Sequence, residues 1–516
     1  MSNSDQIYDV AIVGFGPSGA VAAGLLGAQG LRTYVCDRSR EIYDLPRAIA
    51  LDHEIMRVFQ QLGVVEAITP YLEPFTDSCY YGVEGQLIRR MSTVAPPYPM
   101  GYTPSIVFTQ PPVEKILREH AQGLPSVEVE LGIELTDLAQ DADGVTLQLR
   151  SDSGQTRSVR ARYVIACDGA SSTVRTLAGI TLEDLGFDEP WLVIDARVNE
   201  KGLVKLPQES VQYCEPQRPC TYIIGPGNHR RWEISINEGE DPKQLVTPEG
   251  TWKLLSRWIT PEDGTLWRQA SYRFHALVAA NWRAGRVFVA GDAAHQQPPF
   301  LGQGMCQGVR DVANLSWKLG EVLAGRADEG LLDSYGIERK GHVTELTTRI
   351  KHIGLLIGER DPARAKERDV RLLAECGGVV KAVPRQNVQP ALAAGLLFPM
   401  PNAATGTLFP QPWLMVDGKK QRMDALIGSG WRLVLKAGTA ANIAPALDAL
   451  PMPVAVLRLG TTGMVEADGV LENWFGTQQC MAALVRPDHY VYGVAASAAE
   501  LDRLSQVLTI QLKNGD

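Results

Sequence analysis

The stretch DVAIVGFGPSGAVAAGLLGAQGLRTYVCD, residues 9–37, decides the fold of this chain. Val10–Val13 is a short apolar run that ends in glycine, which is typical of a buried parallel strand. A turn follows at once, Ala20–Gln29 is predicted to be a helix, and Leu31–Cys36 is predicted to be the second strand. The order strand, turn, helix, strand predicts an α/β fold with a Rossmann-like first domain.

The turn contains three glycines with the spacing GxGxxG, and an acidic residue ends the second strand. Gly14 lets the chain reverse tightly, Gly16 lets the backbone approach a pyrophosphate, and Gly19 lets the helix pack against the strand. Asp37 can accept hydrogen bonds from both hydroxyl groups of an adenosine ribose, while free N–H groups at the helix N-terminus hold the phosphates. The stretch therefore predicts a site for an adenine dinucleotide.

Two other interpretations of this stretch are weaker. Residues 10–31 carry no charge and are long enough to span a bilayer, but the glycines and Pro17 disfavour a membrane helix. A strand–helix unit without a ligand would leave the three glycines and Asp37 unexplained. No membrane segment is therefore expected here.

Composition excludes several classes of protein. The chain has 516 residues, enough for two or three domains, and its 50 lysines and arginines against 59 aspartates and glutamates give a net charge of −9. The arginines are dispersed, so no nucleic-acid surface is expected. The cysteines form no CxxC pair and no metal-ligand spacing, which predicts reduced thiols, no metal site and a cytoplasmic protein.

Two later segments repeat the pattern of a buried strand followed by a polar turn. Arg162–Cys167 is followed by Asp168 and Gly169, and Arg286–Ala290 is followed by Gly291 and Asp292. A loop rich in proline and glycine comes next, and a long helix is predicted to begin at residue 304. Its free N–H groups and its dipole would stabilise an electron-rich ring held by the loop.

The middle of the chain has a different texture. Residues 180–275 alternate short apolar segments with proline and glycine turns, and they predict a mostly β domain for the substrate. Tyr213 and Tyr222 would line an aromatic pocket in this domain, or they would simply pack its sheet. Before this domain, a β-meander is predicted from Val127–Leu131, Gly144–Leu149 and Ser158–Arg160.

The final part of the chain predicts a separate domain. Residues 383–413 are rich in proline, alanine and glycine and are predicted to be an ordered linker. Residues 414–516 have the predicted element order βαβαββα of a thioredoxin-like domain, but the two cysteines of thioredoxin are absent. Packing or a homodimer contact is therefore the expected role. Residues 1–179 and 276–382 are then left as one discontinuous dinucleotide-binding domain.

Three separated motifs together resemble those of the FAD-dependent aromatic hydroxylases, the single-component flavoprotein monooxygenases. The motifs are GFGPSG with its terminal Asp37, CDGASSTVR at 167–175 and GDAAHQQPPFLGQGM at 291–305. The nearest resemblance is to the 3-(3-hydroxyphenyl)propionate hydroxylases, through GPGNHRRWE at 225–233 and GQGMCQGVRDVANLSWKL at 302–319. Those enzymes also carry a thioredoxin-like C-terminal domain without the active cysteines.

The resemblance implies a set of FAD-binding residues drawn from the whole first domain. Arg47 would contact the flavin and the pyrophosphate, although an arginine in a loop is often only solvated. Asp168 would lie near the pyrophosphate, or it would cap the helix that follows it. The full set is Gly14, Gly16, Ser18, Gly19, Asp37, Arg38, Arg47, Gln110, Arg118, Asp168, Gly169, Asp292, Pro299, Gly302, Gly304 and Met305.

The resemblance also implies the chemistry. NAD(P)H would reduce FAD, O2 would add at flavin C4a to give a hydroperoxide, and a phenolic ring such as that of 3-(3-hydroxyphenyl)propionate would be hydroxylated in a dry pocket. Arg47, His295 and Gln297 are candidate catalytic residues, although His295 could merely brace its loop. Arg231 could face an acidic substrate or stay solvated.

Two alternatives remain open from the sequence. The substrate could be a heteroaromatic compound, such as a quinolone, or a polyketide metabolite. The protein could also bind FAD without turnover, as a carrier or a regulatory protein.

Overall fold

The computed structural model describes residues 7–439, 442–460 and 464–514. Its first sheet is built around β1 (Ile7–Val13), which runs parallel to β2 (Thr33–Asp37) and to β11 (Thr156–Ala166). α1 (Pro17–Ala28) connects β1 to β2 and is buried along most of its length. The strand order is β17 (Arg283–Ala284), β18 (Val287–Val289), β11, β1, β2 and β8 (Val127–Leu131). Two further strands branch from this order: β10 (Val145–Ser151) pairs with β11, and β9 (Ile133–Gln140) pairs with β10.

The register of this sheet brings the sequence motifs together. Val13 pairs with Cys36 of β2 and with Ala166 of β11, and Ala166 pairs with Val289 of β18. The carboxyl ends of these four parallel strands therefore meet at one edge of the sheet, where ligands of open α/β sheets bind. We call the residues that directly follow β1, β2, β11 and β18 the motif edge.

The predicted β-meander is wrong in its pairing. Residues 127–131 do form a strand, β8, but it extends the sheet beside β2 in parallel. Residues 158–160 are part of the single long strand β11, because no turn residue separates them from residues 162–166. β9, β10 and β11 are the antiparallel strands that remain.

The second sheet has nine strands and draws on more of the chain than residues 180–275. Its order is β19 (His295–Gln296), β16 (Gly264–Ala279), β12 (Leu182–Val198), β15 (His229–Ser235), β14 (Cys220–Ile224), β13 (Ser210–Tyr213), β5 (Ser78–Tyr81), β6 (Leu87–Ser92) and β20 (Ala382–Pro384). β5 and β6 enter through a parallel pairing with β13, a contact between distant segments that strand periodicity does not reveal.

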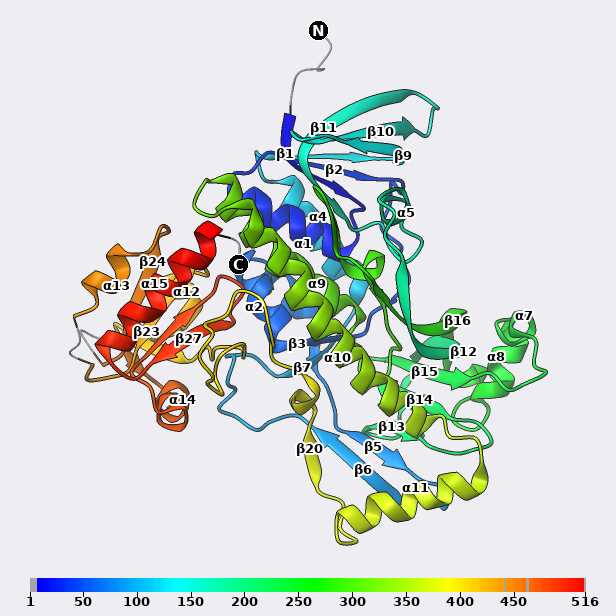
Figure 1. Ribbon diagram of the computed structural model, residues 1–516. Helices are drawn as coiled ribbons and strands as arrows, with labels where there is room; N and C mark the ends of the chain where they lie inside the picture. The colour runs from blue at the N-terminus through cyan, green and yellow to red at the C-terminus, as the bar shows by residue number, and fades with distance from the viewer. Residues whose placement is uncertain (1–6, 440–441, 461–463, 515–516) are drawn as a thin grey trace.

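The two faces of the second sheet have different neighbours. The outer face packs under α8 (Pro248–Leu255) in an apolar cluster with Trp232 and Leu255. The inner face packs against α10 (Asp333–Ile357) and against Phe300 and Leu301. α9 (Gly304–Leu323) packs against the first part of α10, and Figure 1 shows α10 continuing toward the second sheet.

The C-terminal part folds around a four-stranded sheet and lies beside α2 and α9, on the orange and red side of Figure 1. Its strands in spatial order are β24 (Val454–Arg458), β23 (Trp431–Leu435), β26 (Ala482–Val485) and β27 (Val491–Ala495). α13 (Ala444–Asp448) and α15 (Ala498–Asn514) pack together at this sheet, and α14 (Val470–Gln478) joins a second apolar cluster that includes Phe409. The predicted elements βαβαββα are all present from residue 431 onward, but the prediction missed β21, β22 and α12, which precede them, and β25, which lies between β24 and α14. The first helix of that prediction includes residue 441, which lies outside the described residues.

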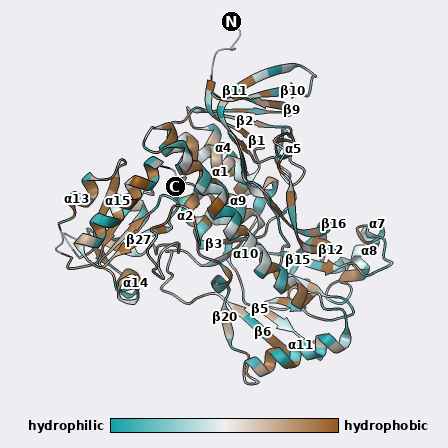
Figure 2. Cartoon of the chain, viewed as in Figure 1, coloured by the Kyte–Doolittle hydropathy of each residue, from teal (hydrophilic) through white to brown (hydrophobic). Residues whose placement is uncertain are grey.

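The remaining elements include the surface helix α11, the half-buried helix α4 and two three-stranded sheets, β22-β21-β25 and β3-β7-β4. Figure 2 shows hydrophilic and hydrophobic residues side by side along α11, as expected of a helix that lies on the surface. The helices are α2 (His53–Gln61), α3 (Val65–Ile68), α4 (Gln110–Gln122), α5 (Thr173–Leu177), α6 (Glu200–Leu203), α7 (Pro242–Leu245), α11 (Pro362–Glu375) and α12 (Met423–Ile427). The other strands are β3 (Ala50–Asp52), β4 (Leu72–Pro74), β7 (Ser105–Phe108), β21 (Trp413–Val416), β22 (Lys419–Arg422) and β25 (Val465–Glu466), and the 3-10 turns are η1 (Thr69–Tyr71), η2 (Pro261–Asp263), η3 (Gly291–Ala293), η4 (Glu329–Leu332) and η5 (Arg385–Val388).

Within the described residues, no helix combines the length and the apolar character needed to cross a membrane.

Candidate active site

The three glycines of the first turn have different structural requirements. Gly14 has φ +98°, and a Cβ atom there would overlap the carbonyl oxygen of Cys167. A Cβ atom at Gly19 would overlap the carbonyl oxygen of Gly14. Gly16, in contrast, has an ordinary φ of −66° and no atom within 4 Å of the Cβ position. The fold therefore needs glycine at 14 and 19, whereas at 16 the absence of a side chain leaves open space before the first turn of α1.

Ser18 links the first turn to the later motif. A Cβ atom at Gly291 would lie 2.8 Å from Ser18 Oγ, and one at Gly308 would overlap the same oxygen. The Ser18 hydroxyl is therefore confined between η3 and α9. This close packing holds the start of α1 beside the GD turn at residues 291–292.

Asp37 and Arg118 stabilise the outer part of the motif edge. The Asp37 carboxylate accepts hydrogen bonds from the backbone N–H groups of Phe15 (2.6 Å) and Ser39 (2.7 Å). A carboxylate has further acceptor capacity, so these two bonds leave room for ribose hydroxyls. Arg118 is buried, pairs with Glu114 at 2.7 Å and lies over the Phe15 ring at 5.3 Å. Arg38, next to Asp37, is exposed.

Asp168 holds the start of a helix at the motif edge. Its carboxylate accepts hydrogen bonds from the Ser172 hydroxyl and from the backbone N–H of Val174 at the start of α5. Burial raises the pKa of Asp168, while these hydrogen bonds act in the opposite direction. Gly169 has φ +83° and no atom within 4 Å of its Cβ position. Asp168 therefore helps to hold the first turn of α5, whose N-cap residue is Ser172, and its place near the pyrophosphate stays a prediction.

Asp292 lies on the open side of the motif edge. Asp292 is exposed at the surface. Protein atoms around its carboxyl group nevertheless reduce the solvation of the charged form, and this raises the pKa of Asp292. His295 and Arg47 act against this shift through their charges. Asp292 and Arg47 are therefore neighbours around one accessible region.

The loop that carries Arg47 is fixed on two sides. Gln110 accepts hydrogen bonds at Oε1 from the backbone N–H groups of Arg47 (3.1 Å) and Ala48 (2.6 Å). Arg231 donates from Nη1 to the Arg47 carbonyl (2.8 Å) and from Nη2 to the Pro46 carbonyl (3.1 Å). The Arg47 side chain itself is exposed and lies near the Tyr43 ring. The loop backbone is thus held in place while the guanidinium stays accessible.

The proposed contact of Arg231 with an acidic substrate is corrected by this arrangement. Arg231 is 3% exposed, and its Nε and Nη2 atoms donate to Asp195 at 2.7 and 3.1 Å. Each of its three side-chain nitrogen atoms donates to Asp195 or to the Arg47 loop. Arg231 therefore positions the loop, and it is not solvated.

The N-terminus of α9 faces the same region. Gln303, the N-cap residue, makes no capping bond, because its Oε1 accepts hydrogen bonds from Arg310 and Gln389. Gly304 has no atom within 4 Å of its Cβ position, and Met305 follows it in the first turn. The first N–H groups of a 20-residue helix are thus available to negative charge.

The loop before α9 has a close turn at its end. The Gly302 N–H donates to the Pro299 carbonyl at 2.6 Å, and Gly302 has φ +64°. A Cβ atom at Gly302 would lie 2.7 Å from the Ala50 Cβ, so the loop packs directly on β3. The turn from Pro299 to Gly302 thus leads directly into α9, whose first turn contains Met305.

His295 has a bracing role. Its Nε2 lies 2.7 Å from Asp311 Oδ2, and the same carboxylate accepts from the Gly291 N–H and from Arg339 Nε, both at 2.9 Å. The imidazole also stacks on Trp282 with ring centroids 5.6 Å apart. His295 is 1% exposed, so it ties the GD turn to α9 and does not face the accessible region.

Gln297 has a different environment from His295. Both polar atoms of its side-chain amide are buried, and neither has a hydrogen-bond partner among the described residues. A buried unpaired amide is costly, by about 1–3 kcal/mol per group. Gln297 therefore remains available for a polar ligand.

The predicted aromatic pocket at Tyr213 and Tyr222 is wrong. Both side chains lie on the outer face, where Tyr222 packs against Trp232 and Tyr213 against Trp258. The Tyr213 hydroxyl accepts from Trp258 Nε1, and burial raises the pKa of Tyr222 to about 12. Successive side chains of a strand point to opposite faces of the sheet, so the residues next to Tyr213 and Tyr222 in sequence point to the inner face.

Sequence reasoning missed three side chains of the inner face. Arg385 lies in the predicted linker, yet it stacks over the Phe75 ring at 4.3 Å and donates to the Leu301 carbonyl at 2.9 Å. Gln386 beside it keeps a buried Oε1 without a partner. Glu233 is 2% exposed. In the sequence HRRWEIS at 229–235, polar residues stand at 229, 231, 233 and 235. This spacing of two is the one signal that could have indicated a polar inner face.

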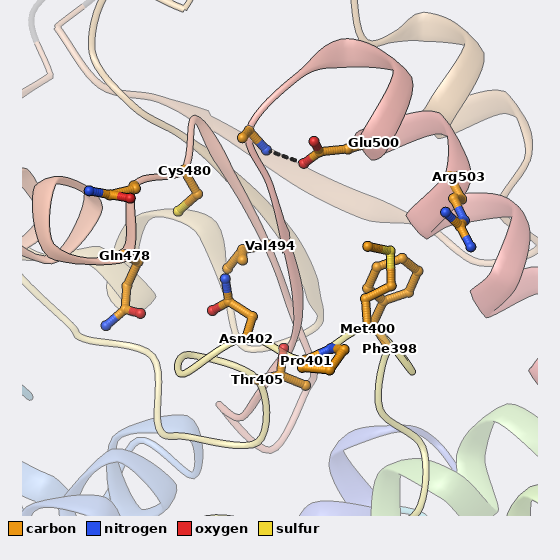
Figure 3. Close-up of a pocket in the computed structure, with 12 residues that line it drawn as sticks. Phe398, Met400, Pro401, Asn402, Thr405, Gln478, Cys480, Val494, Glu500 and Arg503 are labelled. Atoms are coloured by element: carbon orange, nitrogen blue, oxygen red, sulfur yellow. Dashed lines mark hydrogen bonds between the residues drawn. The ribbon is translucent and has the colours of Figure 1, made fainter.

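Two further features lie away from this site. The described residues contain no cluster of three or more potential metal ligands, and all eight cysteines are free. Figure 3 shows a pocket of about 100 Å³ between the segment 398–405 and the C-terminal sheet, with Cys480 and Arg503 in its lining. It does not include any residue of the motif edge.

Comparisons with known proteins agree with this geometry. Residues 7–350 match the family described as FAD binding domain, and residues 406–511 match the HcaD C-terminal domain. A protein named probable NADH-specific resorcinol 4-hydroxylase from Rhodococcus jostii (strain RHA1) is 37% identical over 98% of this chain and 95% of its own length. A 3-(3-hydroxy-phenyl)propionate/3-hydroxycinnamic acid hydroxylase from Mycobacterium sp. (strain JLS) is 32% identical over 96% of this chain and 91% of its own length.

Solved structures share the fold over nearly the full length. The flavin-dependent monooxygenase PieE, in complex with FAD and substrate, has a TM-score of 0.83 at 21% identity and covers 98% of this chain and 99% of its own. Aklavinone-11 hydroxylase, in a ternary complex with FAD and aklavinone, has a TM-score of 0.79 at 24% identity and covers 99% of this chain and 100% of its own. The mixed α/β fold, the matched family and the relatives together show that this chain belongs to the FAD binding domain family of flavin-dependent aromatic hydroxylases.

Proposed function

We propose that this protein hydroxylates a small phenol, of the kind represented by resorcinol and 3-(3-hydroxyphenyl)propionate, with FAD as cofactor and NAD(P)H and O2 as co-substrates. The observation that carries the FAD part of the proposal is the position of Gly16, which the fold does not require but which a bound pyrophosphate does. The names of the two relatives supply the substrate class. The name of the first relative favours NADH over NADPH.

The residues of the motif edge fit FAD. Open space at Gly16 and the first turn of α1 suit the pyrophosphate, and Asp37 suits the adenosine ribose. Asp292 suits a ribityl hydroxyl, and the free N–H groups at Gly304 and Met305 suit the electron-rich edge of the ring. Bound FAD supplies the redox chemistry with O2, and the chain supplies binding, orientation and exclusion of water.

Each other predicted FAD residue has a role that its contacts support. Ser18, Gln110 and Arg118 would shape the site through the packing and hydrogen bonds described above, and Arg47 would reach the pyrophosphate from its fixed loop. Pro299 and Gly302 would border the flavin ring. Arg38 and Gly169 would flank the adenosine and pyrophosphate ends.

We further propose that the chain is organised as a discontinuous FAD-binding domain (residues 1–179 and 276–382), a substrate domain (180–275), a linker (383–413) and a thioredoxin-like domain (414–516). The order β24, β23, β26, β27 with helices on both faces supports the last assignment. β5 and β6 belong functionally with the substrate domain, because they complete its sheet.

The test of the proposed function uses the purified protein with FAD. NADH and NADPH oxidation is measured with resorcinol, with 3-(3-hydroxyphenyl)propionate and with aklavinone, and the products are examined by mass spectrometry. We expect one of the two small phenols to stimulate NADH oxidation and to gain one oxygen atom. Stimulation by aklavinone alone would favour a polyketide substrate, and a yellow protein without any stimulated oxidation would support FAD binding without turnover.

A second prediction separates the bracing role of His295 from a catalytic one. We expect His295→Ala to lower the free energy of unfolding by about 1–3 kcal/mol, because Asp311 loses a buried partner. The pH profile of phenol-stimulated NADH oxidation should keep its shape, since the imidazole does not touch the substrate. Urea unfolding and the pH profile are measured beside His275→Ala, a control at a partly exposed histidine of β16. A pH profile altered only by His295→Ala would contradict the bracing role.

A further inference from the structure

The inner face of the second sheet contains one carboxylate that no residue satisfies. Glu233 is 2% exposed, and its Oε2 atom is buried without a hydrogen-bond partner among the described residues. Its side chain also forms no ion pair there. Buried carboxylates are normally paired, so an unpaired one calls for an explanation.

The strand register places Glu233 in the middle of the inner face. Glu233 lies opposite Val193 of β12 and opposite Thr221 of β14. Val193 belongs to the cluster that contains Phe300 and Leu301, from the loop that would border the flavin ring. Cross-strand neighbours have Cβ atoms about 4.5–5.5 Å apart, so Glu233 is one side chain away from that loop.

A second set of contacts confirms the direction in which Glu233 faces. Arg231, two residues earlier on the same face of β15, reaches the carbonyl oxygens of Pro46 and Arg47. Ile223, opposite Arg231 on β14, packs with Phe75 and Val107. Glu233 therefore shares a face of the sheet with Arg231, which reaches the Arg47 loop, and with Val193, which packs with Phe300 and Leu301. An aromatic substrate held between those two loops would meet this face.

The charged neighbours of Glu233 do not neutralise it. Arg231 and Arg268 face it from β15 and β16, but Asp195 of β12 holds Arg231 at 2.7 Å and lies 3.6 Å from Arg268. Thr221 on β14 donates its hydroxyl to Gln212 and carries no charge. Burial raises the Glu233 pKa to about 7, with the Asp195 charge acting in the same direction and the two arginines opposing it.

We propose that Glu233 is the base that takes the proton from the substrate's phenolic hydroxyl, an assignment that rests on the proposed function. The phenol O–H bond breaks, its electron pair stays on oxygen, and a new O–H bond forms on the Glu233 carboxylate. The negative charge spreads to the ortho and para carbons, which makes the ring a better nucleophile. When the ring carbon that received oxygen loses its hydrogen as a proton, the phenolic oxygen recovers its own proton from Glu233.

The experiment compares wild type with Glu233→Gln, which keeps the shape and removes the base. Holoenzyme is saturated with resorcinol or 3-(3-hydroxyphenyl)propionate, and three quantities are measured against pH: hydroxylation rate, binding constant and ultraviolet absorbance of bound phenolate. We expect Glu233→Gln to lower the rate at pH 7 by about 10²–10⁴-fold while binding changes little. Its rate should then rise only as the pH approaches the phenol's own pKa of about 10.

Controls and outcomes keep this proposal separate from the proposed function. Glu249→Gln, at an exposed residue of α8, removes the same charge and should behave as wild type. Glu233→Asp should recover part of the rate. A wild type that hydroxylates neither phenol overturns the proposed function itself. An active wild type whose pH profile is retained in Glu233→Gln overturns the role of Glu233. If Glu233→Gln does not bind FAD, the test uses the ultraviolet absorbance of the phenol bound to wild type, measured against pH. If the bound phenol ionises only near the pKa of the free phenol, Glu233 is not the base.

Discussion

Replacing Gly16 by valine is expected to abolish flavin binding while leaving the protein folded. The backbone at Gly16 has φ −66°, which any residue adopts, and no atom of the chain lies within 4 Å of the added Cβ. The new side chain would instead occupy the space that the pyrophosphate needs. Steric overlap of this kind weakens binding by about 3 kcal/mol or more, which is at least about a hundredfold in the dissociation constant.

The measurement is FAD titration followed by flavin fluorescence, with urea unfolding of the apoprotein beside it. Gly341→Val is the matched control, because Gly341 also has no atom within 4 Å of its Cβ position but is exposed on α10. Unchanged FAD affinity in Gly16→Val would show that the first turn does not hold the pyrophosphate. Gly19→Ala is expected to differ from both, since its Cβ would overlap the Gly14 carbonyl and disturb the fold itself.

Glu338→Gln is expected to destabilise the whole protein by about 3–5 kcal/mol, because buried Lys318 loses its carboxylate and buried Arg486 keeps only the carboxylate of Asp488. Glu338 on α10 accepts from Lys318 of α9 at 2.7 Å and from Arg486 of the C-terminal part at 2.6 Å. All three side chains are 0% exposed. The carboxylate thus joins α9, α10 and the C-terminal part at a single point, and its loss affects all three.

The same contact predicts how stability depends on pH. Arg486 and Lys318 outweigh burial and lower the pKa of Glu338 from 4.5 to about 2. As the pH falls, Glu338 is protonated in the unfolded chain before it is protonated in the folded protein. The contribution of Glu338 to the free energy of unfolding is therefore complete above about pH 4.5 and is lost towards pH 2. The shift corresponds to roughly 3 kcal/mol.

Urea unfolding of wild type and Glu338→Gln at several pH values tests both statements. The wild type should lose stability over this range more steeply than the variant, which has no carboxyl at this position. Glu183→Gln is the control, because the Glu183–Lys340 pair (2.9 Å) also involves α10 but its carboxylate is 51% exposed. An exposed pair contributes only about 0–1 kcal/mol. Equal effects of the two substitutions would contradict the importance of the buried contact.

Much of the candidate site followed from local sequence, because each motif directly follows a strand. Gly14 and Asp37 were assigned from strand and turn patterns, and Asp168 and Asp292 from the resemblance of their motifs to those of the aromatic hydroxylases. The parallel register of β1, β2, β11 and β18 then places all four at one edge. The elements of the C-terminal part from β23 onward, apart from β25, were likewise predicted from local sequence, because they have strong local periodicity.

The errors have one physical source. A period of two predicts that Trp232 and Glu233, neighbours on one strand, point to opposite faces, but it does not say which face α8 covers. Arg385 was assigned to a linker because local composition cannot show that β20 pairs with β6 and brings the next residues onto the inner face. Likewise, no sequence pattern shows that Arg231 holds the Arg47 loop or that His295 is paired with Asp311.

The sequence by itself therefore determined the local units, the α/β class, the cofactor and the family, because strands, turns and glycine requirements depend on neighbouring residues. Only the tertiary structure decided which polar side chains are free to meet a ligand. Partners of buried charges come from distant segments. Arg231 proved to be held by Asp195 and His295 Nε2 by Asp311, while His295 Nδ1, the Gln297 amide and Glu233 Oε2 have no partner among the described residues. That distinction depends on long-range packing, which local patterns do not encode.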